Sequence, residues 1–138
     1  MKSGKPYRLQ REGNLLILRA AVGGMGGSVT VLRLLLDTGA SYTMLPVEAV
    51  EALGCDTHHP LRRVRIVAAN GIIVAPVVSV RWLHCLGRRL EEWPVVAHTL
   101  PQGAFVDGLL GMDFLTHVKA TISVSTGEIL YEPVGRSE

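Results

Sequence analysis

An apolar segment that ends in an acidic residue and a glycine constrains the fold of this chain more than any other feature. Residues 31–36 are apolar apart from Arg33, and a run of this length predicts a buried strand. Asp37 follows the run directly, and Thr38 and Gly39 come next, where a glycine lets the chain turn sharply. A carboxylate at the end of a buried strand costs free energy unless it is hydrogen-bonded or paired. Asp37 is therefore the first candidate for a functional residue.

Two further stretches form a pattern with this one. Residues 107–115 read Asp-Gly-Leu-Leu-Gly-Met-Asp-Phe-Leu, which indicates a short apolar strand, a glycine and the beginning of a helix. Between the two apolar segments, Asn-Gly at 70–71 separates strand-like stretches at 64–69 and 72–80. Asn-Gly between apolar runs is the strongest short-range signal for a β-hairpin. The sequence therefore predicts, in this order, an acidic strand end, a hairpin, and a strand that leads into a helix.

The rest of the chain predicts short strands joined by turns. The glycine-rich stretch 23–27 has no Lys-Ser or Lys-Thr ending and precedes another strand, so we expect a hairpin tip there and not a phosphate-binding loop. Pro76 indicates a sheet edge or a bulge, because it cannot donate to a strand ladder. Pro46 near the start and Gly54 at the end frame a short helix. The remaining expected elements are strands at 15–22, 28–36, 82–86, 90–98, 120–124 and 128–131 and a helix at 112–117.

Length and composition favour one globular domain. The chain has 138 residues and 48% apolar content, and we expect the domain at 14–132, between a polar, flexible arm at 1–13 and a tail at 133–138. The net charge of +2 is small, and the basic clusters at 62–65 and 88–89 are not interleaved with aromatic residues, so we expect no nucleic-acid partner. No apolar run approaches a membrane span, and no signal-like segment is visible. We therefore expect a cytoplasmic protein with no membrane partner.

The cysteines and histidines give little sign of a cofactor. Cys55 and Cys85 are too few for a disulfide framework and fit free, buried thiols in a reducing compartment, although the sequence leaves a disulfide between them open. His58 and His59 lie close to Cys55, but no second ligand cluster has suitable spacing for zinc. We expect neither a metal nor an organic cofactor.

The segments Asp-Thr-Gly-Ala at 37–40 and Gly-Leu-Leu-Gly at 108–111 together resemble the active-site segments of the retropepsin-like aspartic proteases. The resemblance covers most of the chain and implies a mostly β, closed barrel or sandwich with a flap hairpin and one or two short helices. It also implies an aspartic endopeptidase that binds a peptide or protein substrate. Such an enzyme needs two carboxylates that share one proton and activate water. Because this chain has one Asp-Thr-Gly and no room for a second lobe, the partner carboxylate would be Asp37 of a second copy in a homodimer.

The resemblance assigns roles to residues around Asp37. In the active-site loop, Thr38 would hold the two copies together and the Gly39 carbonyl would contact the substrate backbone. The flap would close over an extended peptide, apolar pockets would receive substrate side chains, and the downstream segment would support the site. The loop residues are Thr38, Gly39, Ala40 and Ser41, the flap residues are Ala69, Asn70, Gly71 and Ile72, the pocket residues are Met44 and Leu109, and the supporting residues are Leu110 and Gly111.

Two departures from the retroviral pattern keep another function open. Retroviral members carry an acidic residue after Asp-Thr-Gly-Ala and an arginine after the downstream glycine, and these two residues form an ion pair. This chain has Ser41 and Met112 there, and its flap tip has fewer glycines. The alternative function is a weak or inactive module that uses the same fold for dimerisation or peptide binding. A phosphorylated aspartate of the cation-pump type is rejected, because the lysine expected after Asp37 is absent.

Overall fold

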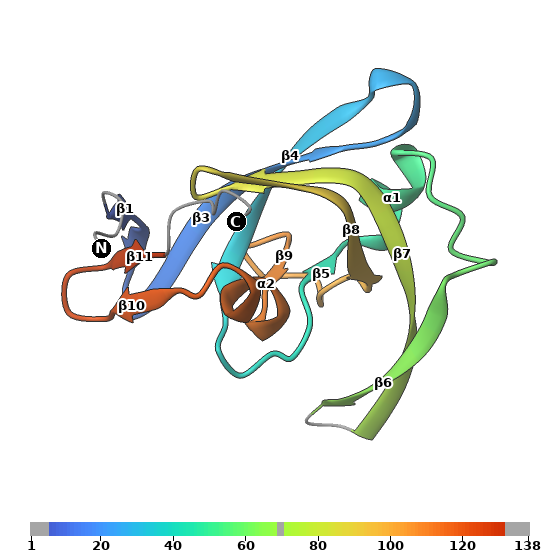
Figure 1. Cartoon of the computed structure of the whole chain (residues 1–138). Coiled ribbons are helices and arrows are strands. Elements are labelled where there is room, and N and C mark those ends of the chain that lie inside the picture. The colour runs from blue at the N-terminus through green and yellow to red at the C-terminus, as the bar shows by residue number, and fades with distance from the viewer. Residues whose placement is uncertain (1–5, 69–70, 132–138) are drawn as a thin grey trace.

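The chain forms a mostly β structure with two short α-helices, as the sequence predicts. We describe it from a computed structural model, which covers residues 6–68 and 71–131 (Figure 1). None of the helices in these residues is long and apolar enough to cross a membrane. The strands are β1 (Tyr7–Arg8), β2 (Gln10–Glu12), β3 (Leu15–Gly23), β4 (Val29–Leu36), β5 (Met44–Leu45), β6 (Arg62–Ala68), β7 (Gly71–Cys85), β8 (Arg88–Ala97), β9 (Gly108–Leu110), β10 (Thr121–Ser123) and β11 (Glu128–Leu130). The helices are α1 (Val47–Ala52), α2 (Met112–His117) and a 3-10 turn, η1 (Met25–Gly27).

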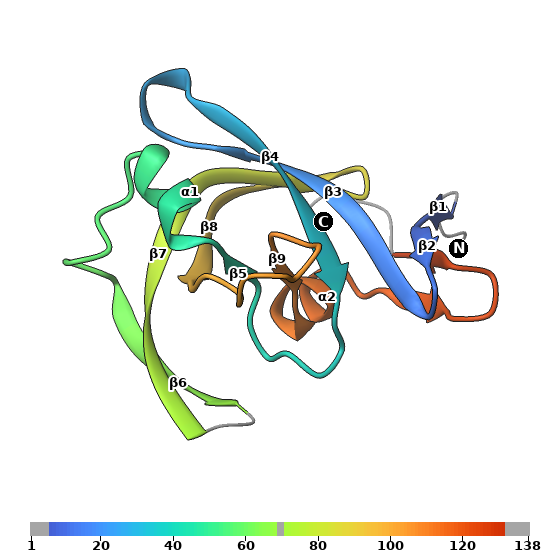
Figure 2. The ribbon, with the colours of Figure 1, turned by 180° about the vertical axis from the view of Figure 1, so that it is seen from behind.

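Most strands belong to one sheet that closes on itself. Its eight strands follow the order β2-β3-β4-β9-β5-β8-β7-β6, and β3 also pairs with the far part of β7. This extra pairing joins β3, β4, β9, β5, β8 and β7 into a ring, so the expectation of a closed barrel is confirmed. Most pairs are antiparallel, but β4 pairs with β9, and β5 with β8, in parallel. A separate three-stranded sheet, β1-β11-β10, lies at the opposite end of the molecule from the β6–β7 hairpin (Figures 1 and 2).

The predicted buried strand before Asp37 is only half buried. Leu34 is completely buried and Leu32 nearly so, whereas Val31, between Leu32 and the solvent-exposed end of β4, is 58% exposed. The alternation arises because β4 pairs antiparallel with β3 and turns one face of that pair to solvent. The apolar run in the sequence therefore overstates how deeply the strand is buried.

The main core joins the strands before the site to the helix after it. Leu34 of β4, Leu110 of β9 and Phe114 of α2 are all fully buried and belong to this core. Val50 and Leu53 bring α1 into it. A smaller apolar cluster connects β5 with β6, β7 and β8, and its members are Met44, Val64, Ala75, Val77 and Val96.

The β6–β7 hairpin extends beyond the rest of the sheet. The ladder between β7 and β8 ends at Val77, whereas the ladder between β7 and β6 continues to Gly71. Pro76 therefore lies where β7 has a partner only on its β6 side, which fits the edge position that its missing N–H demands. Residues 71–76 and their β6 partners form a two-stranded ribbon that curves away from the body of the molecule (Figure 1).

The expectation of a flexible arm at 1–13 is wrong for residues 7–12. Strand β1 pairs with β11, and β2 pairs with β3, in spite of the polar composition of this stretch. Two apolar side chains anchor it: Leu9 is buried in the main core, and the ring of Tyr7 stacks on Tyr131 with centroids 6.0 Å apart. Residues 1–5 and the predicted tail at 133–138 lie outside the described residues.

Both cysteines are free thiols in the structure. Cys85 is 2% exposed, and burial raises the pKa of its thiol from 9.0 to about 12. The unfolded chain loses the thiol proton at a lower pH than the folded chain, so rising pH favours the unfolded state. The contribution of this thiol to stability is complete below pH 9 and is lost between there and the folded pKa.

We predict that the free energy of unfolding falls above pH 9 with a contribution from Cys85 of up to about 1.4 kcal/mol per pH unit. Replacement of Cys85 by Ala should remove this part of the decline, whereas replacement of Cys55, which is only partly buried, should leave most of it. Urea unfolding between pH 8 and about 11 measures the effect. An equally steep decline in the Cys85→Ala variant would show that the buried thiol is not its source.

Candidate active site

Asp37 lies where two parallel strands end side by side. Leu36, the last residue of β4, pairs with Leu110, the last residue of β9. The backbone N–H of Asp37 then donates to the carbonyl of Leu110 at 3.0 Å. Because the two strands run in the same direction, Asp37 and Gly111 follow neighbouring carboxyl ends at the same end of the sheet. The structure thus brings together the two segments that the sequence analysis singled out.

The backbone after Asp37 forms a tight turn around its carboxylate. The N–H of Gly39 donates to Oδ1 of Asp37 at 2.9 Å, and the N–H of Ala40 donates to the carbonyl of Asp37 at 3.1 Å. Oδ2 of Asp37 has no partner among residues 6–68 and 71–131. Thr38 and Ser41 are exposed on the turn. One carboxylate oxygen is therefore held in place, and the other is available to a ligand or a second chain.

The N-terminus of α2 holds this loop from the other side. The N–H of Met112 donates to the carbonyl of Ala40 at 2.8 Å, and the N–H of Asp113 donates to the carbonyl of Ser41 at 3.2 Å. Gly111 lies so close to the loop that a Cβ there would come within 2.6 Å of backbone atoms of Tyr42 and 2.9 Å of the Ala40 carbonyl. The close packing of the loop against the start of α2 therefore requires glycine at 111, since any side chain would push the loop away.

A buried Thr–Asp contact, which the sequence analysis missed, completes the support. The hydroxyl of Thr43 donates to Oδ1 of Asp113 at 2.8 Å, and the N–H of Thr43 lies 3.0 Å from both carboxylate oxygens. The N–H of Gly111 donates in turn to the Thr43 hydroxyl at 3.1 Å. Thr43 is fully buried, so its hydroxyl and N–H cannot reach water and need these hydrogen bonds to be satisfied. An acid in the first turn of a helix was the only visible signal, and it does not reveal which residue it contacts.

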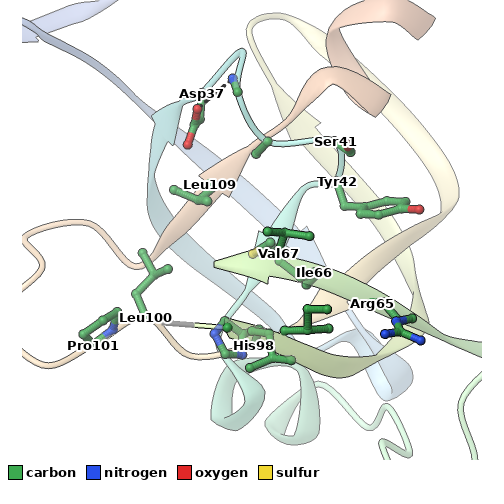
Figure 3. Close-up of a pocket in the computed structure, with 16 residues that line it drawn as sticks. Asp37, Ser41, Tyr42, Arg65, Ile66, Val67, His98, Leu100, Pro101 and Leu109 are labelled. Atoms are coloured by element: carbon green, nitrogen blue, oxygen red, sulfur yellow. Dashed lines mark hydrogen bonds between the residues drawn. The ribbon is translucent and has the colours of Figure 1, made fainter. Parts of the chain in front are cut away.

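A groove of about 860 Å³ opens beside Asp37, between the active-site loop and the β6–β7 hairpin (Figure 3). The predicted pocket residues Met44 and Leu109 line it together with Asp37, and so do Gly71 and Ile72 of the predicted flap. The other flap residues, Ala69 and Asn70, lie outside the described residues. The remaining lining residues are Gly39, Ala40, Ser41, Tyr42, Arg65, Ile66, Val67, Ile73, His98, Leu100 and Pro101.

The groove contains one acidic group and two basic ones. Asp37 is the only carboxylate among the described residues that line it, and Arg65 and His98 are the basic side chains. In Figure 3, Asp37 lies on one side of the groove, and Arg65 and His98 lie on the other. In the described part of the chain, no group of three or more His, Cys, Asp or Glu side chains could hold a metal ion.

The other aspartates are engaged elsewhere. Oδ2 of Asp107 accepts the backbone N–H of Arg33 at 2.8 Å. The carboxylate of Asp56 lies 2.8 Å from a ring nitrogen of His59, and this hydrogen bond lowers the pKa of Asp56. Both residues occupy structural positions outside the groove, as Asp113 does. Asp37 is thus the one aspartate of the described chain that faces the groove.

Comparisons with known proteins identify the family and the fold. The model of the family described as "Aspartyl protease" matches residues 19–114, which include Asp37 and the segment up to Phe114. The structure is similar to the crystal structure of a retropepsin-like aspartic protease from Rickettsia conorii, with a TM-score of 0.67 and 20% sequence identity over 96% of each chain. This likeness shows that the fold is retropepsin-like, as predicted. No curated protein sequence matches the chain.

We predict that replacing Asp113 with Ala destabilises the protein by at least about 2 kcal/mol, because each buried donor left unsatisfied costs about 1–3 kcal/mol. The donors concerned are the hydroxyl and the N–H of Thr43. The matched control is Asp107→Ala, which loses one hydrogen bond in an exposed setting and should cost less than about 1 kcal/mol. Chemical unfolding of both variants measures the difference, and equal losses would contradict a special role for the Thr43–Asp113 contact.

Proposed function

Because the chain belongs to the aspartyl protease family, we propose that it is an aspartic endopeptidase that works as a homodimer. One observation carries this proposal. Asp37 borders a groove of about 860 Å³, and its Oδ2 has no partner in the described chain. The surrounding loop is fixed by β9 and α2, which is what a catalytic carboxylate needs to keep its position during a reaction.

The proposed chemistry requires a second carboxylate. In an aspartic dyad one carboxylate is ionised and takes a proton from water, while the other is protonated and polarises the peptide carbonyl. No second carboxylate lines the groove in the described residues, which supports the proposal that a second copy of the chain supplies it. A two-fold axis between the loops would bring one Asp37 from each copy together, because a two-fold interface places the same residues opposite each other.

The proposed dimer lacks the ion pair of the retroviral enzymes. Ser41 and Met112 occupy the corresponding positions, and both are exposed in the single chain. Met112 is 41% exposed at the start of α2, directly beside the active-site loop. An apolar contact there would replace an ionic one. We therefore expect a dimer that forms reversibly and needs a higher protein concentration than a dimer that has the ion pair.

The proposed substrate is an extended peptide. The groove is lined in part by β6, which stands at the end of the sheet order and pairs only with β7, so a peptide can bind by adding a strand to its other edge. The ribbon would act as a flap that closes over the peptide and excludes water. Met44, Leu109 and Ile66 give the groove apolar walls, so we expect hydrophobic side chains beside the cleaved bond.

We predict that the wild type cleaves members of a diverse peptide mixture between acidic and neutral pH, and that Asp37→Asn abolishes cleavage while the protein still dimerises. Mass spectrometry identifies the products, and light scattering gives the mass in solution. The matched control is Asp107→Asn, which should remain active because Asp107 lies outside the groove. A stable wild-type dimer that binds peptides but cleaves none at any pH would favour the peptide-binding module instead.

We also predict that the active site is shared between two chains. Activity per mole of protein should rise with concentration, and an excess of inactive Asp37→Asn chain should suppress the wild type by drawing it into mixed dimers with one carboxylate missing. Adding the same excess of Asp107→Asn should not suppress it. Activity that is proportional to wild-type concentration and insensitive to the Asp37→Asn chain would contradict a shared site.

A further inference from the structure

The two basic side chains that line the groove have no acidic partner in the described residues. Four arginines of the described chain, Arg8, Arg33, Arg81 and Arg89, each form an ion pair with a glutamate. Arg65 forms none, and neither its guanidinium nor the imidazole of His98 has a hydrogen-bond partner in residues 6–68 and 71–131. Both side chains therefore present unused donors where they line the groove.

Backbone pairing places both residues, although their side chains have no partner in the described residues. Arg65 pairs with Val74 within the β6–β7 ladder. His98 follows β8 directly, and its N–H donates to the carbonyl of Leu45 at 2.9 Å. The ladder sets the register of Arg65 within the ribbon, β5 holds the backbone of His98, and both side chains lie on the side of the groove away from Asp37 (Figure 3). In Figure 3 the apolar side chains of Leu109, Val67 and Ile66 lie between them and Asp37.

This arrangement makes the groove asymmetric for a bound peptide. Consider a peptide whose scissile bond lies at Asp37 and whose hydrophobic side chains pack against the apolar walls. Such a peptide still gives the basic side chains on the other side of the groove no acidic partner. An acidic side chain further along the peptide would meet Arg65 and His98 and form charge-assisted hydrogen bonds. A basic side chain at the same place would be repelled, so the groove discriminates in both directions.

We propose that Arg65 and His98 are specificity-determining residues that select substrates with an acidic side chain a few residues from the hydrophobic cleavage site. This inference rests on the proposed function, because it assigns the substrate class of the same groove. Arg65 is exposed, so solvent screens its interaction and the selectivity should be moderate, about three- to tenfold.

The test compares pairs of peptides that share a hydrophobic cleavage sequence found in the mixture experiment. The two members of a pair differ only by Glu or Gln at one flanking position, and each pair tests a different position. Cleavage is measured at about pH 5.5, where free glutamate is ionised and free imidazole is protonated. We expect the wild type to show a three- to tenfold higher kcat/KM for the Glu peptide at one or two positions. In Arg65→Gln and His98→Gln the ratio should fall, and in the double variant it should approach one.

The control is Arg63→Gln, which removes an arginine two residues away on the same strand that does not line the groove. It should keep the wild-type ratio. Equal cleavage of the Glu and Gln peptides by the wild type, or an unchanged ratio in the double variant, would overturn the proposal.

A second measurement separates this proposal from the proposed catalysis. If no peptide is cleaved, binding of fluorescent Glu and Gln peptides, built on an apolar core, is compared in the Asp37→Asn chain by anisotropy. Tighter binding of the Glu peptide that depends on Arg65 and His98 would support the selectivity although the protease function had failed. Binding without preference, or no binding of either peptide, would overturn the selectivity as well.

Discussion

The site depends on the parallel pairing of β4 with β9. This pairing aligns Leu36 with Leu110, and only for that reason does Asp37 emerge beside Gly111 and the start of α2. Strand β5 then packs so closely that a Cβ on Gly108 would lie 2.1 Å from the carbonyl of Met44. Glycine at 108 and 111 is therefore a condition for the three-way contact of β9, β5 and the loop, and the hydrogen bonds around Asp37 follow from it.

The two sides of the groove are supported in different ways. The side that carries Asp37 is tied to β9 and α2 by backbone hydrogen bonds and by the buried Thr43–Asp113 contact. The opposite side is the two-stranded ribbon of β6 and β7. Beyond Val77, towards Gly71, β7 pairs with β6 and no longer with β8. Isolated two-stranded ribbons are only marginally stable in water. In the proposed enzyme, this arrangement would keep the carboxylate in position while the less constrained wall moves to admit a substrate.

The sequence was most informative where local chemistry decides the structure. Asn70 and Gly71 predicted the hairpin, Pro46 and Gly54 predicted a short helix, and the residues around Asp37 predicted the family and the retropepsin-like fold. It was least informative where a contact joins distant residues. The Thr43–Asp113 hydrogen bonds need the β4–β9 pairing before the two residues meet, and the pairing of residues 7–12 depends on Leu9 and Tyr7 finding partners far along the chain.

The small β1-β11-β10 sheet has a mechanical consequence. Tyr7 pairs with Ile129, so the outer ends of β1 and β11 lie next to each other at one end of an antiparallel ladder. A pull applied to the two ends of the chain would open this ladder like a zip, breaking one pair at a time, whereas a shearing load would have to break all pairs together. Under tension the molecule would therefore yield first at this sheet, at low force, and only then would the load reach the eight-stranded sheet that carries Asp37.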